Sequence, residues 1–305
     1  MREALIVGIG ACVADTLYRV ASFPREDTKL CAKERRIAGG GPVATGLVAA
    51  AKLGCNSAYI GNLADDESGR FLASDFEKYG VGTENINFVS GCRTFSSCLI
   101  LAEDSGTRTC VFDRGDLPPL ELTEPQRELI RRARLLMVDG NDLSAAIEGA
   151  KLARASGVKV LYDCGGQYSG VEALLALTDI MIPSEEFALA KTGCDKAEDA
   201  AEKLFETYRP DAVVITQGKR GGVCFDGERR WSYPAYPAKV VDSNGAGDVF
   251  HGAFAAAYVS GYGTEKCCHF ASATSAIKCN GVGARESTPD LNTVRNFLKE
   301  NGYEL

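Results

Sequence analysis

Short apolar runs alternate with amphipathic segments along most of this chain. A strand buried in a parallel sheet is apolar on both faces, so a short apolar run bounded by turn residues predicts such a strand. The runs of this kind are Ala4–Val7, Ala58–Ile60, Leu135–Val138, Val158–Tyr162, Ile180–Ile182 and Ala212–Thr216. Helices are predicted at Val43–Leu53, Ser68–Tyr79, Leu143–Ser156 and Lys196–Tyr208. The alternation predicts an α/β fold in which helices cover both faces of a mostly parallel sheet.

Two segments fall outside this strand and helix alternation. Val13–Val20 and Lys29–Ile37 are typical of strands, and Ser96–Leu101 with Thr107–Phe112 is typical of a hairpin. We expect them to form a small β-sheet lid, from about residues 12–38 and 93–114, inserted in a single domain of residues 1–305. An exposed small sheet has an apolar face and unpaired edges, which a partner commonly covers.

Composition and charge exclude several classes of protein. The 305 residues are 45% hydrophobic with a net charge of -7, which argues against binding to nucleic acid or an anionic membrane. The twelve cysteines form no Cys-x-x-Cys pair, and His251 and His269 are the only histidines. Scattered thiols of this kind indicate buried free cysteines in a reducing cytoplasm. The first apolar run is too short for a signal peptide or a membrane span, so we expect a cytoplasmic protein.

The strongest candidate for chemistry is the stretch Asp242–Asp248, DSNGAGD, which leads directly into an apolar helical pattern. A glycine turn that opens a helix presents free N–H groups and the positive end of the helix dipole, which together bind an anion such as phosphate. A carboxylate beside a phosphate suits a base that takes the proton of the attacking group, and Asp248 has that place. The alternative is a tight turn whose glycines serve only geometry. The pattern favours phosphoryl transfer to a hydroxyl.

Three more glycine-rich segments are candidate ligand loops. Thr216–Gly222 combines glycines with Thr216 and Lys219 and suits a nucleotide, although a plain hairpin loop is the commoner explanation of such a segment alone. Gly39–Gly41 lets the backbone approach a polar ligand, or it only packs a helix. Gly8–Val13 lacks the third glycine and the helix of a dinucleotide fingerprint, which disfavours an NAD-dependent oxidoreductase.

These motifs, in this order, resemble the ribokinase-like (PfkB) family of carbohydrate kinases almost from end to end. Asp242–Asp248 matches the family's Asp-Thr-x-Gly-Ala-Gly-Asp signature except at Ser243. Further counterparts are Gly40-Gly41, Asp65–Gly69, Thr216 with Gly218, and Gly281–Ala284. The resemblance implies a three-layer α/β/α ribokinase-like fold with a β-sheet lid, an ATP-dependent sugar kinase, and a dimer formed through the lid.

The resemblance also implies roles for individual residues. Asp248 corresponds to the catalytic base, which the helix dipole should keep ionised, and Gly245, Ala246 and Gly247 correspond to the backbone anion hole. For ATP the positions are Thr216, Gly218, Lys219 and Gly221, with Ala273, Ala276, Asn280 and Gly283 around adenine. For the sugar they are Asp15, Asp27, Gly40, Gly41 and Thr45. Arg108 is expected either to reach a phosphate or to be an exposed turn residue.

Two metal ions are implied in the same way. Mg²⁺ would neutralise the β- and γ-phosphates and be held mostly through water. Family members often bind a monovalent cation such as K⁺ behind the anion hole, and the matching positions are Asp242, Asn244, Gly281, Gly283 and Ser287. The chain departs from the family at Thr45, where asparagine is common, and at Ser184–Phe187, where the family has Asn-x-x-Glu. Glu185 is the candidate to act on Mg²⁺ through water in place of that motif.

Only weaker similarities to branches of the family indicate which sugar is the substrate. Gly39–Thr45 and Gly245–Gly252 look most like the branch with ketohexokinases and sulfosugar kinases, and the turn Gly106–Thr109 is similar to ketohexokinases. Asn141 lies where kinases of anionic sugars can place arginine, which favours a neutral sugar. We expect a ketohexose-like substrate. The alternatives are a kinase of 2-keto-3-deoxy sugar acids, sulfosugars or nucleosides, and a sugar-binding protein without catalysis, for which an intact Asp248 would have no use.

Overall fold

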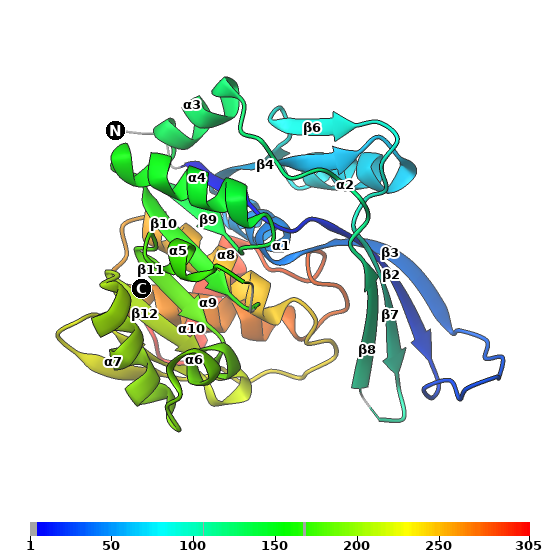
Figure 1. Ribbon diagram of the computed structural model, residues 1–305. Coiled ribbons are helices and arrows are strands. Elements are labelled where there is room, and N and C mark those ends of the chain that lie inside the picture. The colour runs from blue at the N-terminus through cyan, green and yellow to red at the C-terminus, as the bar shows by residue number, and fades with distance from the viewer. Residues whose placement is uncertain (1–4, 106, 167–168) are drawn as a thin grey trace.

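The computed structural model describes residues 5–105, 107–166 and 169–305, which form two β-sheets and the helices around them (Figure 1). The large sheet has ten strands in the order β14-β13-β12-β11-β10-β9-β1-β4-β5, with β6 beside β4. Neighbours from β12 to β5 are parallel, and β13 and β14 form an antiparallel edge. Their bounds are β1 Leu5–Ile9, β4 Asn56–Ala64, β5 Val81–Gly82, β6 Ile86–Val89, β9 Leu135–Val138, β10 Lys159–Cys164, β11 Ile180–Pro183, β12 Ala212–Thr216, β13 Gly222–Phe225 and β14 Arg230–Tyr233.

Helices cover both faces of this sheet (Figure 1). On one face lie α1 Pro42–Lys52, α2 Glu67–Lys78, α8 Ala246–Val259, α9 Thr264–Lys278 and α10 Leu291–Glu300. On the other lie α3 Glu124–Arg132, α4 Leu143–Ala155, α5 Glu172–Leu175, α6 Glu185–Thr192 and α7 Ala197–Tyr208. In β9, Leu135 and Met137 belong to the first core and Leu136 and Val138 to the second, because successive side chains of a strand point to opposite faces. The predicted three-layer arrangement is confirmed.

The second sheet extends away from the layers and is the predicted lid (Figure 1). Its strand order is β3-β2-β7-β8, with bounds β2 Val13–Val20, β3 Glu34–Gly40, β7 Ser96–Ala102 and β8 Thr107–Asp113. The central strands β2 and β7 are parallel, and each outer strand is antiparallel to its neighbour. Every residue of β8 is exposed, so this edge strand leaves its backbone groups and its apolar side chains open to a partner.

Most predicted elements end within two residues of their observed ends, and β2, β9 and β12 have the predicted bounds. The strand predicted at Lys29–Ile37 is an exception, because β3 begins only at Glu34 and Leu30 is 44% exposed, with no core to pack against. The short run Ala58–Ile60 proved to be the middle of the longer β4. The elements that the pattern did not place are α3, α5, α6, α9, α10, β5, β6, β13 and β14.

Two further observations bear on the sequence predictions. Ala4 and Gly106, which belong to the predicted first strand and hairpin turn, lie outside the described residues. All twelve cysteines are free thiols, as their spacing indicated, but only six of them are buried, and Cys31 and Cys110 are exposed. Within the described ranges, no helix has the length and apolar character needed to cross a membrane.

Candidate active site

The glycine turn ahead of α8 has the geometry that its sequence predicts. Gly245 caps the helix with a φ of 71°, and a Cβ on it would lie 2.3 Å from the Cβ of Ala284, so this position requires glycine. Apart from its two chain neighbours and the backbone of its own helix, no described heavy atom lies within 4 Å of where a Cβ on Gly247 would be, which leaves space beside the helix N-terminus. An anion in that space would meet the positive end of the helix dipole.

Asp248 lies on the first turn of α8, beside this space. Loss of water around the carboxyl raises its pKa, and the nearby cationic groups His251, Arg108, Lys278 and Arg285 act in the opposite direction. The helix dipole alone predicted a carboxyl held ionised, whereas burial of the carboxyl acts in the opposite direction. A raised pKa improves a carboxylate as a proton acceptor, because its proton affinity moves toward that of the group it must deprotonate.

His251 and Asp163 form a buried pair beneath the anion hole. The imidazole Nδ1 lies 2.6 Å from the carbonyl oxygen of Gly247 and 3.2 Å from Oδ2 of Asp163, and Nε2 lies 2.9 Å from the carbonyl oxygen of Ile182. Both nitrogens thus face oxygen atoms of other residues, which fix the orientation of the ring. Burial raises the pKa of Asp163 to about 7, and His251 lowers it. The pair joins the first turn of α8 to strands β10 and β11.

Asp15 projects from the lid strand β2 toward the same region. Its Oδ1 accepts a hydrogen bond of 2.6 Å from the Ser97 hydroxyl, and burial raises its pKa to about 6. The negative charge of Asp248 also raises the pKa of Asp15, so the two carboxyls lie close enough to interact. A Cβ on Gly40 would lie 2.1 Å from Oδ2 of Asp15, which explains the glycine in terms of close approach.

Arg285 holds the glycine segment in place, and sequence reasoning did not identify it. The side chain is 1% exposed, pairs with Asp75 at 2.6 Å and donates to the carbonyl oxygen of Gly40 at 2.8 Å. A Cβ on Gly39 would lie 2.0 Å from its Nη1. Gly39 and Gly40 are therefore required by Arg285 and Asp15, and the backbone of the segment faces the candidate sugar site.

Asp139 is a second buried organiser that sequence reasoning did not single out. It accepts hydrogen bonds from the backbone N–H groups of Ala11 at 2.8 Å, Val43 at 3.2 Å and Asn141 at 2.9 Å. These residues follow β1, begin α1 and follow β9, so one carboxylate joins three segments at the carboxyl edge of the sheet. Burial raises its pKa.

The remaining candidate sugar residues are placed less uniformly. Thr45 is fully buried in α1, and its Oγ1 has no hydrogen-bond partner among the described residues. Gly41 caps α1 with a φ of 93°, and a Cβ there would lie 2.2 Å from the carbonyl oxygen of Ala11. Asp27 is exposed on the connection between β2 and β3. The structure thus brings Asp15 and Gly40 together, and Asp27 stays a prediction.

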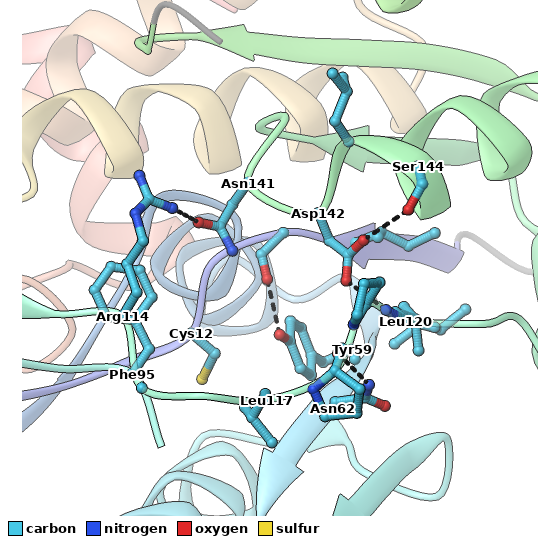
Figure 2. A pocket seen from close by; sticks show the side chains of 18 residues that line it. Cys12, Tyr59, Asn62, Phe95, Arg114, Leu117, Leu120, Asn141, Asp142 and Ser144 are labelled. Carbon is cyan, nitrogen blue, oxygen red and sulfur yellow. Dashed lines mark hydrogen bonds between the residues drawn. The ribbon is translucent and has the colours of Figure 1, made fainter. Parts of the chain in front are cut away.

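Arg108 and Asn141 each meet another side chain. Arg108, on the exposed strand β8, donates from Nη1 to Oδ1 of Asn244 at 2.5 Å and so joins the lid to the turn ahead of α8. Asn141 lies in a cavity of ≈ 440 Å³ at the base of the lid, where its Oδ1 accepts a 3.1 Å hydrogen bond from Arg114 (Figure 2). The guanidinium of Arg114 therefore lies beside Asn141, the residue that favoured a neutral sugar in the sequence.

The candidate nucleotide loop is a hairpin loop, as the alternative explanation of its sequence predicted, and its role in nucleotide binding stays a prediction. Thr216 ends β12, residues Gly218–Arg220 form a short 3₁₀ turn that includes exposed Lys219, and β13 returns antiparallel. Gly221 has a φ of 83°, and a Cβ on it would lie 2.1 Å from the carbonyl oxygen of Tyr233. Glu185 accepts a 2.7 Å hydrogen bond from Gln217 and forms an ion pair with Arg220, so both of its carboxylate oxygens bind this loop.

The segment expected around adenine needs one correction. Ala273 is fully buried and packs in the core beneath the large sheet, so its side chain does not line a nucleotide site. Ala276, at 9% exposed, lies nearer the surface, and Asn280 is exposed and accepts a 2.7 Å hydrogen bond from the backbone N–H of Lys239. A helix buries one side of its surface, and the sequence alone did not show which side of α9 that is.

The five positions predicted for a monovalent cation lie together. Asp242 accepts hydrogen bonds from the N–H groups of Asn244 at 2.8 Å and Gly283 at 2.9 Å. The Ser287 hydroxyl donates to the Gly283 carbonyl oxygen, and a Cβ on Gly281 would lie 2.7 Å from the Cβ of Ser287. Among residues 5–105, 107–166 and 169–305, no three histidine, cysteine or acidic side chains are grouped closely enough to hold a metal ion.

Known proteins show the same sequence pattern and the same fold. The pattern of the pfkB family carbohydrate kinases matches residues 3–291. A ribokinase of Haemophilus influenzae is 27% identical, covering 98% of this chain and 99% of its own length. Fructokinase-1 of rice, Oryza sativa subsp. japonica, is 29% identical over 94% of this chain and 95% of its own.

The solved structures agree with these relatives. Arabidopsis thaliana ribokinase, complexed with ribose and ATP, superposes with a TM-score of 0.87 at 28% identity, covering 98% of this chain and 99% of that one. A ribokinase described as putative, from Agrobacterium tumefaciens, has a TM-score of 0.92 at 24% identity, over 98% of both chains, and shows the fold alone. The ribokinase-like fold expected from the sequence motifs is confirmed.

Proposed function

The chain belongs to the pfkB family of carbohydrate kinases and is an ATP-dependent sugar kinase, and we propose that Asp248 is its general base and a ketohexose-like sugar its substrate. The observation that carries the catalytic proposal is the position of Asp248, on the first turn of α8 beside an open anion site and close enough to Asp15 to influence its pKa. One carboxylate would bind sugar hydroxyls while the other takes a proton.

The reaction follows from this arrangement. Asp248 accepts the proton of the sugar hydroxyl as its oxygen attacks the γ-phosphorus, and the bond from phosphorus to the bridging oxygen of ADP breaks. The N–H groups of Gly245, Ala246 and Gly247 and the α8 dipole stabilise the charge on the transferring group. Thr216, Gly218, Lys219 and Gly221 lie along the nucleotide in this proposal, with Ala276 and Asn280 toward adenine.

Mg²⁺ would neutralise the β- and γ-phosphate oxygens when it enters with ATP. Among the described residues, no group of side chains is arranged to bind a metal ion directly, which fits an ion held through phosphates and water. Glu185 fits the role of a water-mediated ligand poorly, since its two oxygens bind Gln217 and Arg220. Its structural role is to hold α6 against the nucleotide loop.

The sugar is proposed on two grounds. Fructokinase-1 of rice acts, by its name, on a ketohexose, and the motifs Gly39–Thr45 and Gly245–Gly252 look like the ketohexokinase branch. Arg114 beside Asn141 favours a second candidate, an acidic sugar such as a 2-keto-3-deoxy acid or a sulfosugar, since a guanidinium binds a carboxylate or sulfonate well. The cavity in Figure 2 would hold that acidic group.

A substrate panel tests the proposal. ADP formation with MgATP is measured as kcat/KM for ketohexoses, aldopentoses, 2-keto-3-deoxy acids, sulfosugars and nucleosides. A preference for a ketohexose supports the main proposal, and a preference for an acidic sugar that Arg114→Ala removes supports the second. ADP formation that no member of the panel increases would refute both.

We also propose that the protein is cytoplasmic and forms a homodimer through the lid. The exposed apolar side chains of the lid support the dimer, since Val111 is 65% and Phe112 57% exposed on the free edge strand β8. A second copy of the chain that covered them would remove this apolar surface from water.

A further inference from the structure

Lys278 is a charged residue whose side chain is fully buried, where charged groups are rare. It is the last residue of α9, it is 0% exposed, and it continues the buried side of the helix on which Ala271 and Thr274 lie. A buried ammonium costs several kcal/mol unless acceptors compensate it. Its Nζ donates to the carbonyl oxygen of Asp242 at 2.7 Å and lies 3.9 Å from Oδ2 of the same residue. Asp242 is thus the compensating partner.

Asp242 is also one of the five residues at which the family resemblance places a monovalent cation. Several oxygens of that site are already bonded within the chain. The carbonyl oxygen of Asp242 binds Lys278, its carboxylate binds the N–H groups of Asn244 and Gly283, and the Gly283 carbonyl oxygen accepts from Ser287. A K⁺ ion that bound the Asp242 carbonyl oxygen would share it with the Lys278 ammonium at close range, and the two cations repel. The expected K⁺ does not fit this arrangement.

An ammonium group resembles K⁺ in charge and in size, and it prefers the same oxygen acceptors. We propose that the Lys278 ammonium is a built-in monovalent cation that replaces K⁺ behind the anion hole and makes the enzyme independent of added K⁺. The ammonium donates to the carbonyl oxygen of Asp242, which is the first residue of the turn that carries Asn244 and Gly245. Because the cation is tethered, the turn is stabilised without recruiting an ion from solution.

Lys278 acts on catalysis through other groups and is a positioning residue. It shapes the turn through Asp242, and its charge lowers the pKa of Asp248. Loss of the charge should therefore lower kcat more than it raises the KM for ATP, and should move the acid limb of the pH profile to higher pH. A residue that only filled the core would change stability and leave the pH profile in place.

The first experiment uses the unmodified protein and compares K⁺ with choline at constant ionic strength. Sugar kinase turnover and the ATP-induced rise in melting temperature are both measured. We expect less than about a twofold change in either rate or apparent ATP affinity, whereas a required K⁺ would change them by about tenfold or more. Strong activation by K⁺ would overturn the proposal. Because ATP binding needs no sugar, failure of the proposed sugar chemistry remains distinguishable from failure of this inference.

The second experiment uses Lys278→Met, which keeps the apolar stem and removes the charge. We expect turnover to fall by about tenfold or more and to recover partly with NH₄⁺ or K⁺, but not with Na⁺ or choline. Lys52→Met is the matched control, since the Lys52 ammonium also donates to backbone carbonyls of the C-terminal segment, those of Arg285 and Glu286, each at 2.9 Å. Its turnover should not respond to the choice of cation.

The outcomes of the variant are decisive in combination with the first experiment. Full turnover of folded Lys278→Met in choline would overturn the proposal, because no cation would then be needed. If circular dichroism shows that Lys278→Met is unfolded, Lys278→Gln is assayed in its place, and the effect of K⁺ on the unmodified protein decides the question alone.

Discussion

The guanidinium of Arg108 on the lid reaches Asn244 in the turn ahead of α8, with Nη1 2.5 Å from Oδ1. This contact joins the lid to the turn ahead of α8, and the charge of Arg108 lowers the pKa of both Asp15 and Asp248. The lid therefore acts electrostatically on the proposed base.

Replacement of Arg108 by alanine should lower kcat by about tenfold to a hundredfold, because a positive charge beside the transferring phosphate is lost. The pKa of Asp248 should rise, so the acid limb of the kcat profile should move to higher pH. Steady-state kinetics across pH measures both effects. Arg36→Ala is the control, since Arg36 pairs with Glu34 within the lid. An unchanged kcat would show that the contact has no catalytic role.

Replacement of Asp248 by asparagine should abolish most activity and leave the fold intact. The amide cannot accept the proton of the sugar hydroxyl, and loss of a general base costs about 10²- to 10⁴-fold in kcat. ADP formation with the preferred sugar measures the loss, and the ATP-induced melting shift should persist because the anion hole is unchanged. Near-normal turnover of the folded variant would exclude Asp248 as the base.

The hydroxyl of Thr45 should contribute more to sugar binding than to the stability of the fold. A buried hydroxyl without a partner is costly, so Thr45→Val should fold with equal or greater stability. If the hydroxyl binds sugar, kcat/KM for the sugar should fall by about tenfold, while Thr45→Ser should stay close to the unmodified protein. Thermal melting and sugar titrations are the measurements. Unchanged sugar kinetics in Thr45→Val would remove Thr45 from the sugar site.

Activity should decline as the pH falls below about 6, because Asp15 takes up a proton near that pH, which turns one of its oxygens into a donor and removes the charge that strengthens its hydrogen bonds from sugar hydroxyls. In Asp15→Asn the sugar KM should be higher, and the remaining acid limb, due to Asp248, should move to lower pH because a neighbouring negative charge is gone. The exposed lid carboxylate Asp104 gives the control, Asp104→Asn. A pH profile of kcat/KM that is the same in Asp15→Asn would contradict the assignment.

The same carboxyl affects stability in a defined direction. Its pKa in the folded protein, about 6, lies above the ordinary value of 3.8, so folding favours the protonated form. This contribution is complete below pH 3.8 and is lost as the pH rises through about 6. The stability of Asp15→Asn relative to the unmodified protein should therefore increase between these pH values, by at most about 3 kcal/mol. Denaturant unfolding at several pH values measures the difference, and a constant difference would argue against a shifted pKa.

The exposed edge of the lid should control assembly. We expect a dimer by light scattering, and Val111→Glu should yield monomers because a charge would be buried at the proposed interface. Val240→Glu is the matched control, since Val240 is 66% exposed but lies outside the lid. A monomeric mass for the unmodified protein would contradict the dimer.

The elements of the large sheet follow from local sequence. β9 and β12 have the predicted bounds because continuous apolar runs have no other stable place than between two layers of helices. The motif Asp242–Asp248 likewise contains its own structural signal, since Gly245 needs a positive φ and α8 follows at once. Adjacent residues carry these features, so a pattern along the chain was sufficient to predict them.

Contacts between distant segments were beyond such patterns. Arg285 meets Asp75 across 210 positions of the chain, and Asp139 joins Ala11 across 128. Asp139 follows a predicted buried strand and Arg285 follows the motif Gly281–Ala284, but neither local pattern shows which distant groups the side chain binds. Ala273 shows the reverse case, a residue expected at a ligand that packs in the core, because the orientation of α9 depends on α8 and the sheet.

By itself the sequence determined the three-layer fold, the glycine turn ahead of α8 and the identity of the proposed base. These depend on periodicity and on short motifs, whose physical causes act between neighbouring residues. Tertiary structure alone decided which charges are buried and what compensates them, as for Lys278 against Asp242 and His251 against Asp163. The energy of a buried charge depends on every segment packed around it, and that environment exists only after the chain has folded.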